Sequence, residues 1–204
     1  SGSAVVVNKD GLGAGTYYIR VNTYYDGEWA PYTLSDSVYV ATPGIDVEPN
    51  GTRAQALILS PNTTVTGHSN YYYNHLKDSV DWYKITTNAD GRIRLTMTSG
   101  NGQNVWAYLY DTDGTTLIAS GYTSGSADVV NKDGLGAGTY YVRVNTYYTS
   151  EWAPYTLTDS VYAPTQANDT EPNNNKTQAT TLALNGTVTG HTNYYYNLVK
   201  DSSD

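Results

Sequence analysis

The chain has no cysteine and no phenylalanine among its 204 residues. Without cysteine, no disulfide can hold the fold together and no thiolate can act as a nucleophile or a metal ligand. The sequence also has no apolar run of about 18 residues, so nothing in it predicts a membrane-spanning segment.

Positive charge is scarce as well, with 11 Lys and Arg against 19 Asp and Glu, for a net charge of −8. Proteins that bind nucleic acid need basic patches to neutralise phosphate, so we expect no nucleic-acid partner. Thr, Ser, Asn, Gly and Tyr are abundant. This composition is typical of secreted bacterial β-proteins and predicts an extracellular or cell-surface location.

The aromatic residues are 22 Tyr and 4 Trp. Tyrosine favours strands, but its hydroxyl needs water or a hydrogen-bond partner. Two interpretations remain open. Tyrosine has either replaced phenylalanine as a core aromatic, or it forms a surface that contacts glycans or neighbouring protein subunits.

The chain repeats itself at a constant offset of 123 residues. Residues 1–81 align without a gap on residues 124–204, and 57 of the 81 aligned positions are identical. Solenoid repeats are about 20–50 residues long, whereas a unit of this length can form a domain with its own core. The differences concentrate in two stretches rich in Pro, Asn, Asp and Gly, which we interpret as linkers.

The repeat divides the chain into five predicted segments: the C-terminal part of one repeat (1–40), a linker (41–45), a complete repeat (46–162), a second linker (163–168) and the N-terminal part of the next repeat (169–204). Neither outer segment has enough strands to bury a core. We therefore interpret the chain as part of a longer array. The alternative is that its strands complete the sheet of a neighbouring chain. Both interpretations predict polymeric partners, namely further copies of the same repeat.

Alternating apolar residues predict strands at 92–98, 104–110 and 139–145. One face of these strands is expected to be buried: Ile93, Leu95, Met97, Val105, Ala107, Leu109, Tyr140, Val142 and Val144. Asp111–Gly114 is expected to be a hairpin turn, and residues 52–59 a single helical turn. Many short strands separated by turns predict an all-β fold, a jelly-roll-like antiparallel β-sandwich.

Oxygen ligands gather on either side of the strand region that begins the repeat. Asp46, Glu48 and Asn50 alternate before it, and Asp78 and Asp81 follow. All five recur in the second copy, as Asp169, Glu171, Asn173, Asp201 and Asp204. Oxygen ligands of this kind suit Ca²⁺, whereas the lack of accompanying His or Cys disfavours zinc. The alternative is an acidic linker that simply faces water.

The segments EPN, TVTG, KDSVDWYKI, LYDTDGTTL, LGAGTYYVRV and YTL, in that order over residues 48–157, resemble the bacterial pre-peptidase C-terminal domain. This resemblance implies a secreted jelly-roll sandwich that accompanies extracellular enzymes and is related to clostridial collagen-binding domains. In those relatives calcium lies between the N-terminal linker and the first strands. Transferred to this chain, the ligands would be Asp46, Glu48, Asn50, Asp78 and Asp81. The relatives commonly have an acid after the Asn, where this chain has Gly51 and Asn174.

A second candidate site is a set of clustered aromatic residues. The segment NTYYDGEWAPY recurs as NTYYTSEWAPY, and each copy also has a run of three tyrosines. Because successive strand residues point to opposite faces, at least one ring of each run should be exposed. The candidate contact residues are Tyr24, Tyr25, Trp29, Tyr72, Tyr147, Tyr148, Trp152 and Tyr195. The alternative is ordinary shielding of a sheet edge.

Two equivalent Asn-x-Ser/Thr triplets, at Asn62 and Asn185, are candidate glycosylation sites. We find no recurring pair of nucleophile and base, and we expect His68 and His191 to lie at the surface. We therefore predict a non-catalytic structural protein, such as a surface fibre, stalk or adhesin with calcium at its joints. The alternative is an accessory polysaccharide- or collagen-binding region of a secreted hydrolase.

Overall fold

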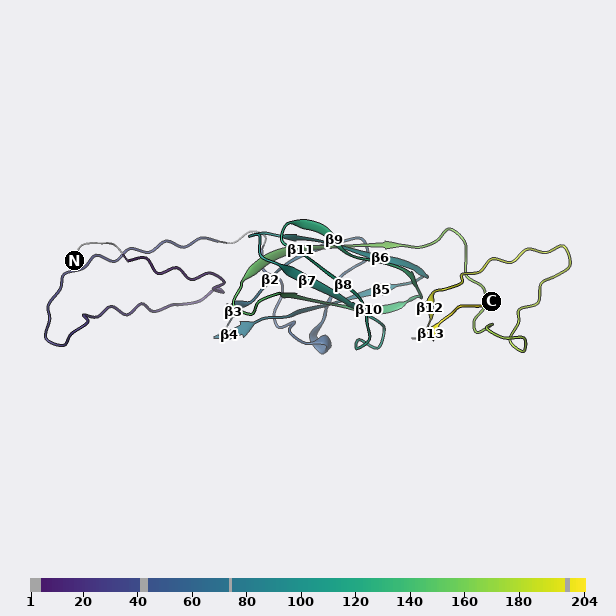
Figure 1. Ribbon diagram of the computed structural model, residues 1–204, viewed down its shortest axis with the longest axis horizontal. Helices are drawn as coiled ribbons and strands as arrows, with labels where there is room; N and C mark the ends of the chain where they lie inside the picture. Colours follow the sequence, from purple (N-terminus) through teal and green to yellow (C-terminus); the bar gives the residue numbers. More distant parts are fainter. Residues whose placement is uncertain (1–4, 41–43, 74, 197–198) are drawn as a thin grey trace.

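The computed structural model describes residues 5–40, 44–73, 75–196 and 199–204. A central β-sandwich lies between an N-terminal and a C-terminal segment, which extend from its opposite ends (Figure 1). Residues 41–43 of the first predicted linker and residues 1–4 lie outside the described residues. Among the described residues, no helix is long and apolar enough to cross a membrane.

Two sheets form the sandwich. The first sheet has the order β1 (Leu57–Ile58), β5 (Asp81–Thr87), β10 (Gly138–Thr146), β7 (Val105–Tyr110) and β8 (Leu117–Thr123). The second has the order β13 (Val199–Lys200), β12 (Tyr195–Tyr196), β9 (Ser126–Leu135), β6 (Gly91–Ser99), β11 (Ala153–Tyr162) and β2 (Thr64–Ser69). A separate hairpin joins β3 (Tyr71–Tyr73) to β4 (Leu76–Asp78). Most pairs are antiparallel, so the fold is the all-β antiparallel sandwich that the sequence predicts.

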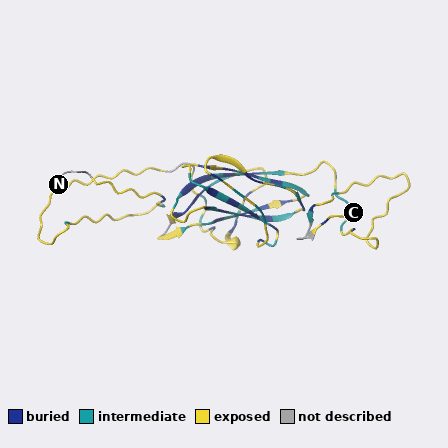
Figure 2. Ribbon diagram, viewed as in Figure 1, coloured by how far each residue is buried: buried dark blue, intermediate teal, exposed yellow. Residues whose placement is uncertain are grey.

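The core lies between the two sheets and confirms the strand alternation (Figure 2). All nine side chains predicted to face inward are buried, each at 1% exposure or less. Burial of one large apolar side chain contributes about 1.5–3 kcal/mol, so these positions supply much of the folding free energy. Tyr83, Tyr140 and Tyr155 are buried with them, so part of the tyrosine does replace core phenylalanine.

Two short local elements also agree with the sequence. The predicted turn joins β7 to β8: the Gly114 N–H donates to the Asp111 carbonyl at 2.7 Å, and Gly114 has a φ of +65°. The Asp113 carboxylate accepts the N–H groups of Thr115 and Thr116 at 2.8 Å. The helical turn predicted over 52–59 is present as the 3₁₀-helix η1, but it covers only Arg53–Gln55, and Leu57–Ile58 form β1 instead.

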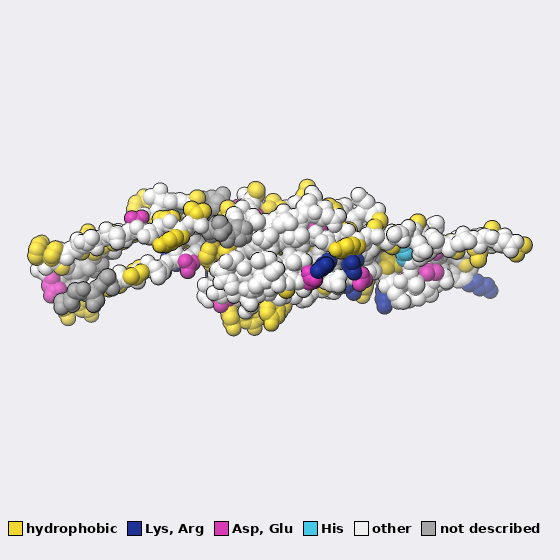
Figure 3. Space-filling model, turned by 90° about the horizontal axis from the view of Figure 1, so that it is seen from above, with side chains coloured by type: hydrophobic (Ala, Val, Ile, Leu, Met, Phe, Trp, Pro, Cys, Tyr) yellow, Lys and Arg dark blue, Asp and Glu magenta, His cyan; other side chains and the backbone are white. Residues whose placement is uncertain are grey.

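The N-terminal segment has nearly the sequence of β9, β10 and β11 but lacks a neighbouring sheet. Its residues 5–40 form no strand, although 5–39 nearly repeat the sequence of β9, β10 and β11. Tyr17 is 52% exposed while its equivalent Tyr140 is 1% exposed, and Tyr32 is 69% exposed while Tyr155 is fully buried. Apolar side chains consequently line the surface of this segment (Figure 3). Nearly the same sequence therefore forms strands only where a sheet and a core are present beside it.

Candidate functional site

The five predicted metal ligands of the first copy meet at one end of the sandwich. Asp46, Glu48 and Asn50 lie in the segment before η1, Asp78 ends β4, and Asp81 begins β5. Carboxylate oxygens of Asp46, Glu48 and Asp81 all lie within 4.8 Å of one another. We call these five residues the first cluster. The Trp82 N–H donates to the Asn50 carbonyl at 3.0 Å, which attaches the incoming chain to β5.

Hydrogen bonds within the incoming chain shape its half of the first cluster. Asn50 Nδ2 donates to Asp46 Oδ2 at 2.5 Å, and the Asn50 N–H donates to Glu48 Oε2 at 3.1 Å. The Glu48–Pro49 peptide bond is cis. Since the Asn50 amide nitrogen donates to Asp46, its side-chain oxygen is left to face another partner.

Three tyrosine hydroxyls support the carboxylates from the core side. Tyr83 donates to Asp46 Oδ2 at 2.7 Å, Tyr155 donates to Asp81 Oδ2 at 2.6 Å, and the two hydroxyls are 2.7 Å apart. Tyr71 donates to Glu48 Oε1 at 3.2 Å. These tyrosines were not among the site residues predicted from the sequence. The sequence did contain one indication of Tyr83. It follows Asp81 by two residues, so both side chains point to the same face of β5.

Several oxygens of the first cluster have no hydrogen-bond partner although they are buried: Asp46 Oδ1, Asn50 Oδ1, Asp78 Oδ2 and Asp81 Oδ1. A buried polar atom without a partner costs about 1–3 kcal/mol, and native proteins have few of them. Four such acceptors in one place, from residues that already meet, fit a bound cation that all four could ligate.

Electrostatics point the same way. Burial raises the pKa of the Asp81 carboxyl well above its usual range, and the charges of Asp46 and Asp78 raise it further. Burial also raises the pKa of Asp78 to about 7, with Glu48 adding to the effect. Burial is likewise the first cause of the raised pKa of Asp46 and of Glu48. These carboxylates therefore repel one another in a poorly solvated place, and a divalent cation would remove that repulsion.

The second copy repeats this arrangement at the other end of the molecule. Carboxylate oxygens of Asp169, Glu171 and Asp204 lie within 4.8 Å of one another. The Asn173 N–H donates to Glu171 Oε2 at 3.1 Å, and its side chain donates to Asp169. We call these residues, with Asp201, the second cluster. Its buried oxygens without a partner include Asp169 Oδ1, Asn173 Oδ1 and Asp201 Oδ2, the equivalents of three in the first cluster.

Gly51, and its equivalent Asn174 in the second copy, follow the Asn of each cluster, where the resemblance predicts an acid. A Cβ added to Gly51 would lie 3.5 Å from the Val80 carbonyl oxygen and 3.9 Å from Asp78 Oδ1, so this position borders the first cluster. In the second copy, the Asn174 side-chain amide can be oriented so that its nitrogen donates to the Asp201 carboxylate and to the Ser203 carbonyl. The residues present therefore fit a calcium ion held by four carboxylates and one amide oxygen in each copy.

The predicted aromatic contact residues fall into separate places. Tyr24, Tyr25 and Trp29 lie on the N-terminal segment and are 88%, 63% and 86% exposed. Tyr72 and Tyr195 lie in β3 and β12, where the outer segments meet the sandwich. In the first tyrosine run the Tyr72 ring is exposed while Tyr71 is buried, as the alternation predicts.

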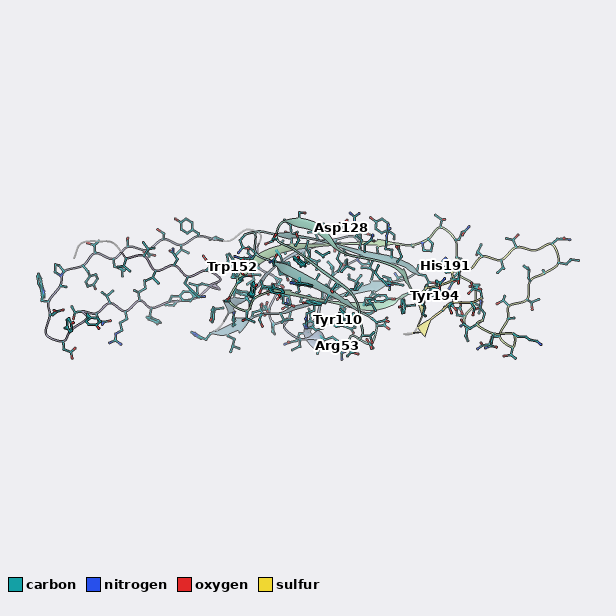
Figure 4. All side chains as sticks on the ribbon, in the orientation of Figure 1. Arg53, Tyr110, Asp128, Trp152, His191 and Tyr194 are labelled. Carbon is teal, nitrogen blue, oxygen red and sulfur yellow. The ribbon has the colours of Figure 1, made fainter. Side chains whose placement is uncertain are left out.

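Trp152 lies at the β3 end of the sandwich (Figure 4), and its ring packs against that of His68. Their rings are edge-on with centroids 5.6 Å apart, and His68 is also edge-on to Tyr71 at 5.9 Å. The expectation that His68 lies at the surface is wrong: the residue is only 9% exposed, because its ring packs against Trp152 and Tyr71. His191 is half-buried at the opposite end, with Nδ1 3.2 Å from Asp90 Oδ2.

Tyr147 belongs to an aromatic surface that the sequence did not predict, and Tyr148 packs edge-on against Tyr147 at 4.6 Å. The Trp106 ring stacks with Tyr122 at 4.7 Å, with Tyr108 at 5.7 Å and with Tyr147 at 6.1 Å, at interplanar angles of 17–27°. We call Trp106, Tyr108, Tyr122 and Tyr147 the aromatic row. The alternation in β7 already put Trp106 and Tyr108 on one face, but the contribution of β8 depends on strand pairing.

The two candidate glycosylation residues occupy equivalent exposed turns. Asn62 has a φ of +62° and Asn185 a φ of +59°. Asn62 Oδ1 accepts the Val161 N–H at 2.9 Å, which ties this turn to β11. Glycosylation itself stays a prediction.

Comparisons with known proteins show which family a central part of the chain is similar to. Residues 79–146 match the family model described as bacterial pre-peptidase C-terminal domain. A solved structure of the pre-peptidase C-terminal domain of a Bacillus anthracis collagenase is 20% identical, with 56% of this chain and 100% of that chain covered and a TM-score of 0.43. A periplasmic inhibitor of g-type lysozyme from Aeromonas hydrophila is 14% identical, with 52% and 99% covered and a TM-score of 0.34. No curated protein matches the chain.

Proposed function

We propose that this chain belongs to a non-catalytic, extracellular tandem-repeat structural protein in which calcium stabilises the joints between repeats. The observation that carries the proposal is the recurrence of the cluster. Equivalent carboxylate and amide oxygens meet in both copies, and the same three atoms are buried without a partner in each.

The chemistry of the donors favours calcium among common cations. Each cluster offers four carboxylates and one amide oxygen, which are the hard ligands that Ca²⁺ prefers in numbers of six to eight. Magnesium usually retains several waters and binds fewer protein ligands, and zinc prefers nitrogen and sulfur. The position of Gly51, which lacks the acid of the relatives, leaves room for water in the coordination shell.

A cation at this place would act on the joint between repeats. Asp46 and Glu48 belong to the chain that enters the sandwich, whereas Asp78 and Asp81 belong to the sandwich. An ion bound to both would attach the linker to the repeat that follows it. A linker rich in Pro, Gly and Asn without such an attachment samples many orientations. An array of repeats with calcium at each joint would be stiff enough to serve as a surface fibre, stalk or adhesin.

Calcium titration tests the proposal directly. We expect isothermal titration calorimetry of the full chain to find two sites, and Asp81→Asn to remove one of them. Because Asp81 is buried while its neighbours are also acidic, Asn at this position should not destabilise the metal-free protein at pH 8, yet it should abolish part of the calcium-dependent rise in melting temperature. Asp133→Asn, in which the replaced carboxylate is 75% exposed, is the matched control. The proposal would be refuted if calorimetry detected no heat of calcium binding and calcium left the melting temperature unchanged.

A second candidate function is an accessory role in binding polysaccharide or a collagen-like substrate for a secreted hydrolase. The aromatic row supports it, since nearly parallel rings with exposed members such as Tyr122 and Tyr147 offer a flat apolar surface. The match to the pre-peptidase C-terminal family, one member of which belongs to a collagenase, supports an accessory role as well. Retention on insoluble polysaccharide or collagen that Trp106→Ala weakens, and Trp29→Ala does not, would favour this function.

A further inference from the structure

The two outer segments touch the sandwich through the same residues of the repeat. At the first joint, the Gly13 N–H donates to the Tyr72 carbonyl at 2.6 Å, and the Tyr72 N–H donates to the Gly11 carbonyl at 2.7 Å. Leu12 and Tyr72 thereby form a parallel bridge. At the second joint, Leu135 and Tyr195 pair in parallel, and the Gly136 N–H donates to the Tyr195 carbonyl at 2.7 Å. Each contact residue of the second joint lies 123 positions after its equivalent in the first.

Side chains repeat the same contact. The Lys9 ammonium lies 5.1 Å from the centre of the Tyr72 ring, and the Lys132 ammonium lies 5.2 Å from the Tyr195 ring. A cation over an aromatic face at this distance is attractive. Backbone and side chains of one repeat therefore recognise the same tyrosine of the next repeat at both joints.

We propose that residues 11–14 and 134–137, which we call the glycine turns, and the tyrosine strands β3 and β12 form a clasp that docks each repeat onto the next. The partner of each half is a second copy of the same repeat. The inference rests on the tandem arrangement of the proposed function and adds to it a contact that needs no metal.

The same contacts form at both joints although the surroundings of the two joints differ. In the first joint the glycine turn belongs to the extended N-terminal segment, whereas in the second it includes the end of β9 of the sandwich, where Leu135 is buried. The tyrosine strand belongs to the sandwich in the first joint and to the C-terminal segment in the second. The clasp forms in both settings, so it is a property of its own residues.

Glycine is required in the clasp for two reasons. Gly11 and Gly134 have φ values of +70° and +67°, a conformation that other residues rarely adopt. A Cβ on Gly11 would lie 2.8 Å from Trp152 Cγ, and one on Gly134 would lie 3.0 Å from the Asn193 carbonyl. The conserved spacing of glycines within the two copies thus allows close approach of the next repeat.

The two halves of the clasp lie at opposite ends of the sandwich. Figure 4 places Trp152 at the end that meets the N-terminal segment and His191 with Tyr194 at the other end. At that other end, Asp90 accepts the Ala137 N–H at 2.9 Å and also contacts His191 Nδ1, so it joins the glycine turn to the next repeat. A contact between two different surfaces at opposite ends generates an open linear assembly.

Amide hydrogen exchange of the full chain tests the clasp. Because the Tyr72 N–H donates to Gly11, its protection reports on the first joint. We expect Gly11→Ala to accelerate exchange at Tyr72 and Gly13 by about tenfold or more, since local opening sets the rate. Gly27→Ala is the matched control: Gly27 also has a positive φ, +84°, but nothing lies within 4 Å of its added Cβ.

Calcium titration of the same proteins separates this inference from the proposed function. We expect Gly11→Ala to leave both calcium sites intact, because Gly11 is not a ligand, and Tyr72 to stay protected in the native chain with chelator present. Protection without any calcium binding would uphold the clasp and refute the calcium joints. A Tyr72 amide that exchanges freely in the native chain, or equal exchange in the two glycine variants, would overturn the clasp.

Discussion

Three tyrosine hydroxyls hold the carboxylates of the first cluster, and each belongs to a ring that also fills space in or beside the core. Tyr83 and Tyr155 are fully buried, so they fix the positions of Asp46 and Asp81 with little freedom. These hydrogen bonds give a physical reason for tyrosine in place of phenylalanine, which is absent from the sequence. At these positions a phenyl ring would fill the same volume but leave a buried carboxylate oxygen without its donor.

Replacing one of these hydroxyls should weaken calcium binding without removing a ligand. We expect Tyr155→Phe to lower calcium affinity about tenfold, because groups that orient metal ligands contribute about 10–100-fold. Tyr140→Phe is the control, since Tyr140 is equally buried but donates to the Gly136 carbonyl away from the cluster. Calorimetry of both variants checks the prediction, and equal affinities for calcium would contradict it.

The raised carboxyl pKa values predict an unusual pH dependence for the metal-free protein. In the unfolded chain Asp78 titrates near its ordinary pKa of 3.8, whereas in the folded protein its pKa is about 7. The folded state therefore binds more protons between these values, so the stability from this group is full below about pH 4 and is lost as pH rises through about 7. The pKa of Asp81 is raised in the same direction.

Denaturant unfolding in chelator should thus show a lower free energy of unfolding at pH 8 than at pH 5. Saturating calcium should reverse this order, because calcium binds the ionised carboxylates and stabilises the folded state by about 2.7 kcal/mol at 100 times its dissociation constant. Unfolding curves that coincide at the two pH values in chelator would show that the carboxylates are not crowded.

Among the secondary-structure elements, β2 and β5 place the cluster against the core. Gly67 in β2 lies opposite Tyr155, and a Cβ at Gly67 would be 2.4 Å from the Tyr155 hydroxyl oxygen. Overpacking of this kind costs about 1–3 kcal/mol. We expect Gly67→Ala to lower the free energy of unfolding by that amount and also to weaken calcium binding, because Tyr155 must move away from Asp81.

Gly125→Ala provides the comparison for this prediction. Gly125 lies just before β9, and nothing is within 4 Å of its added Cβ. Its free energy of unfolding and calcium affinity should match those of the native chain. If the Gly67→Ala protein is as stable as the Gly125→Ala protein, then β2 can shift away from Tyr155 without lowering the free energy of unfolding.

The elements also show how far the sequence alone predicts this molecule. Alternation identified β6, β7 and β10 and their buried faces, because period-two burial is a local property of the chain. The members of the first cluster were predicted because they are close in sequence and recur. The structure brings them together, and their binding of calcium stays a prediction. The aromatic row and the covering of His68 were not found, since both depend on which strands pair. The segment 5–40 makes the same point: its alternation is that of β9–β11, but without a partner sheet it forms no strand.

At the scale of the whole molecule, the clusters and the clasp act on the same joints. Tyr71 donates to Glu48 of the first cluster, and its neighbour Tyr72 pairs with the preceding glycine turn. A cation that fixes the linker would therefore also steady the strand that receives the previous repeat. The two contacts should cooperate in setting one orientation between repeats.

Removing calcium should loosen the joints while the central sandwich stays folded. The core of the central sandwich contains none of the cluster carboxylates, so its cooperative unfolding should persist in chelator at a lower temperature. Small-angle X-ray scattering should meanwhile show a broader distribution of interatomic distances than in calcium, because the linker then bends. The Asp81→Asn chain should resemble the chelated protein at its first joint even with calcium present. If scattering and melting temperature are the same with calcium and with chelator, the ion does not control the joint, and the stiffness of the array would depend on the clasp alone.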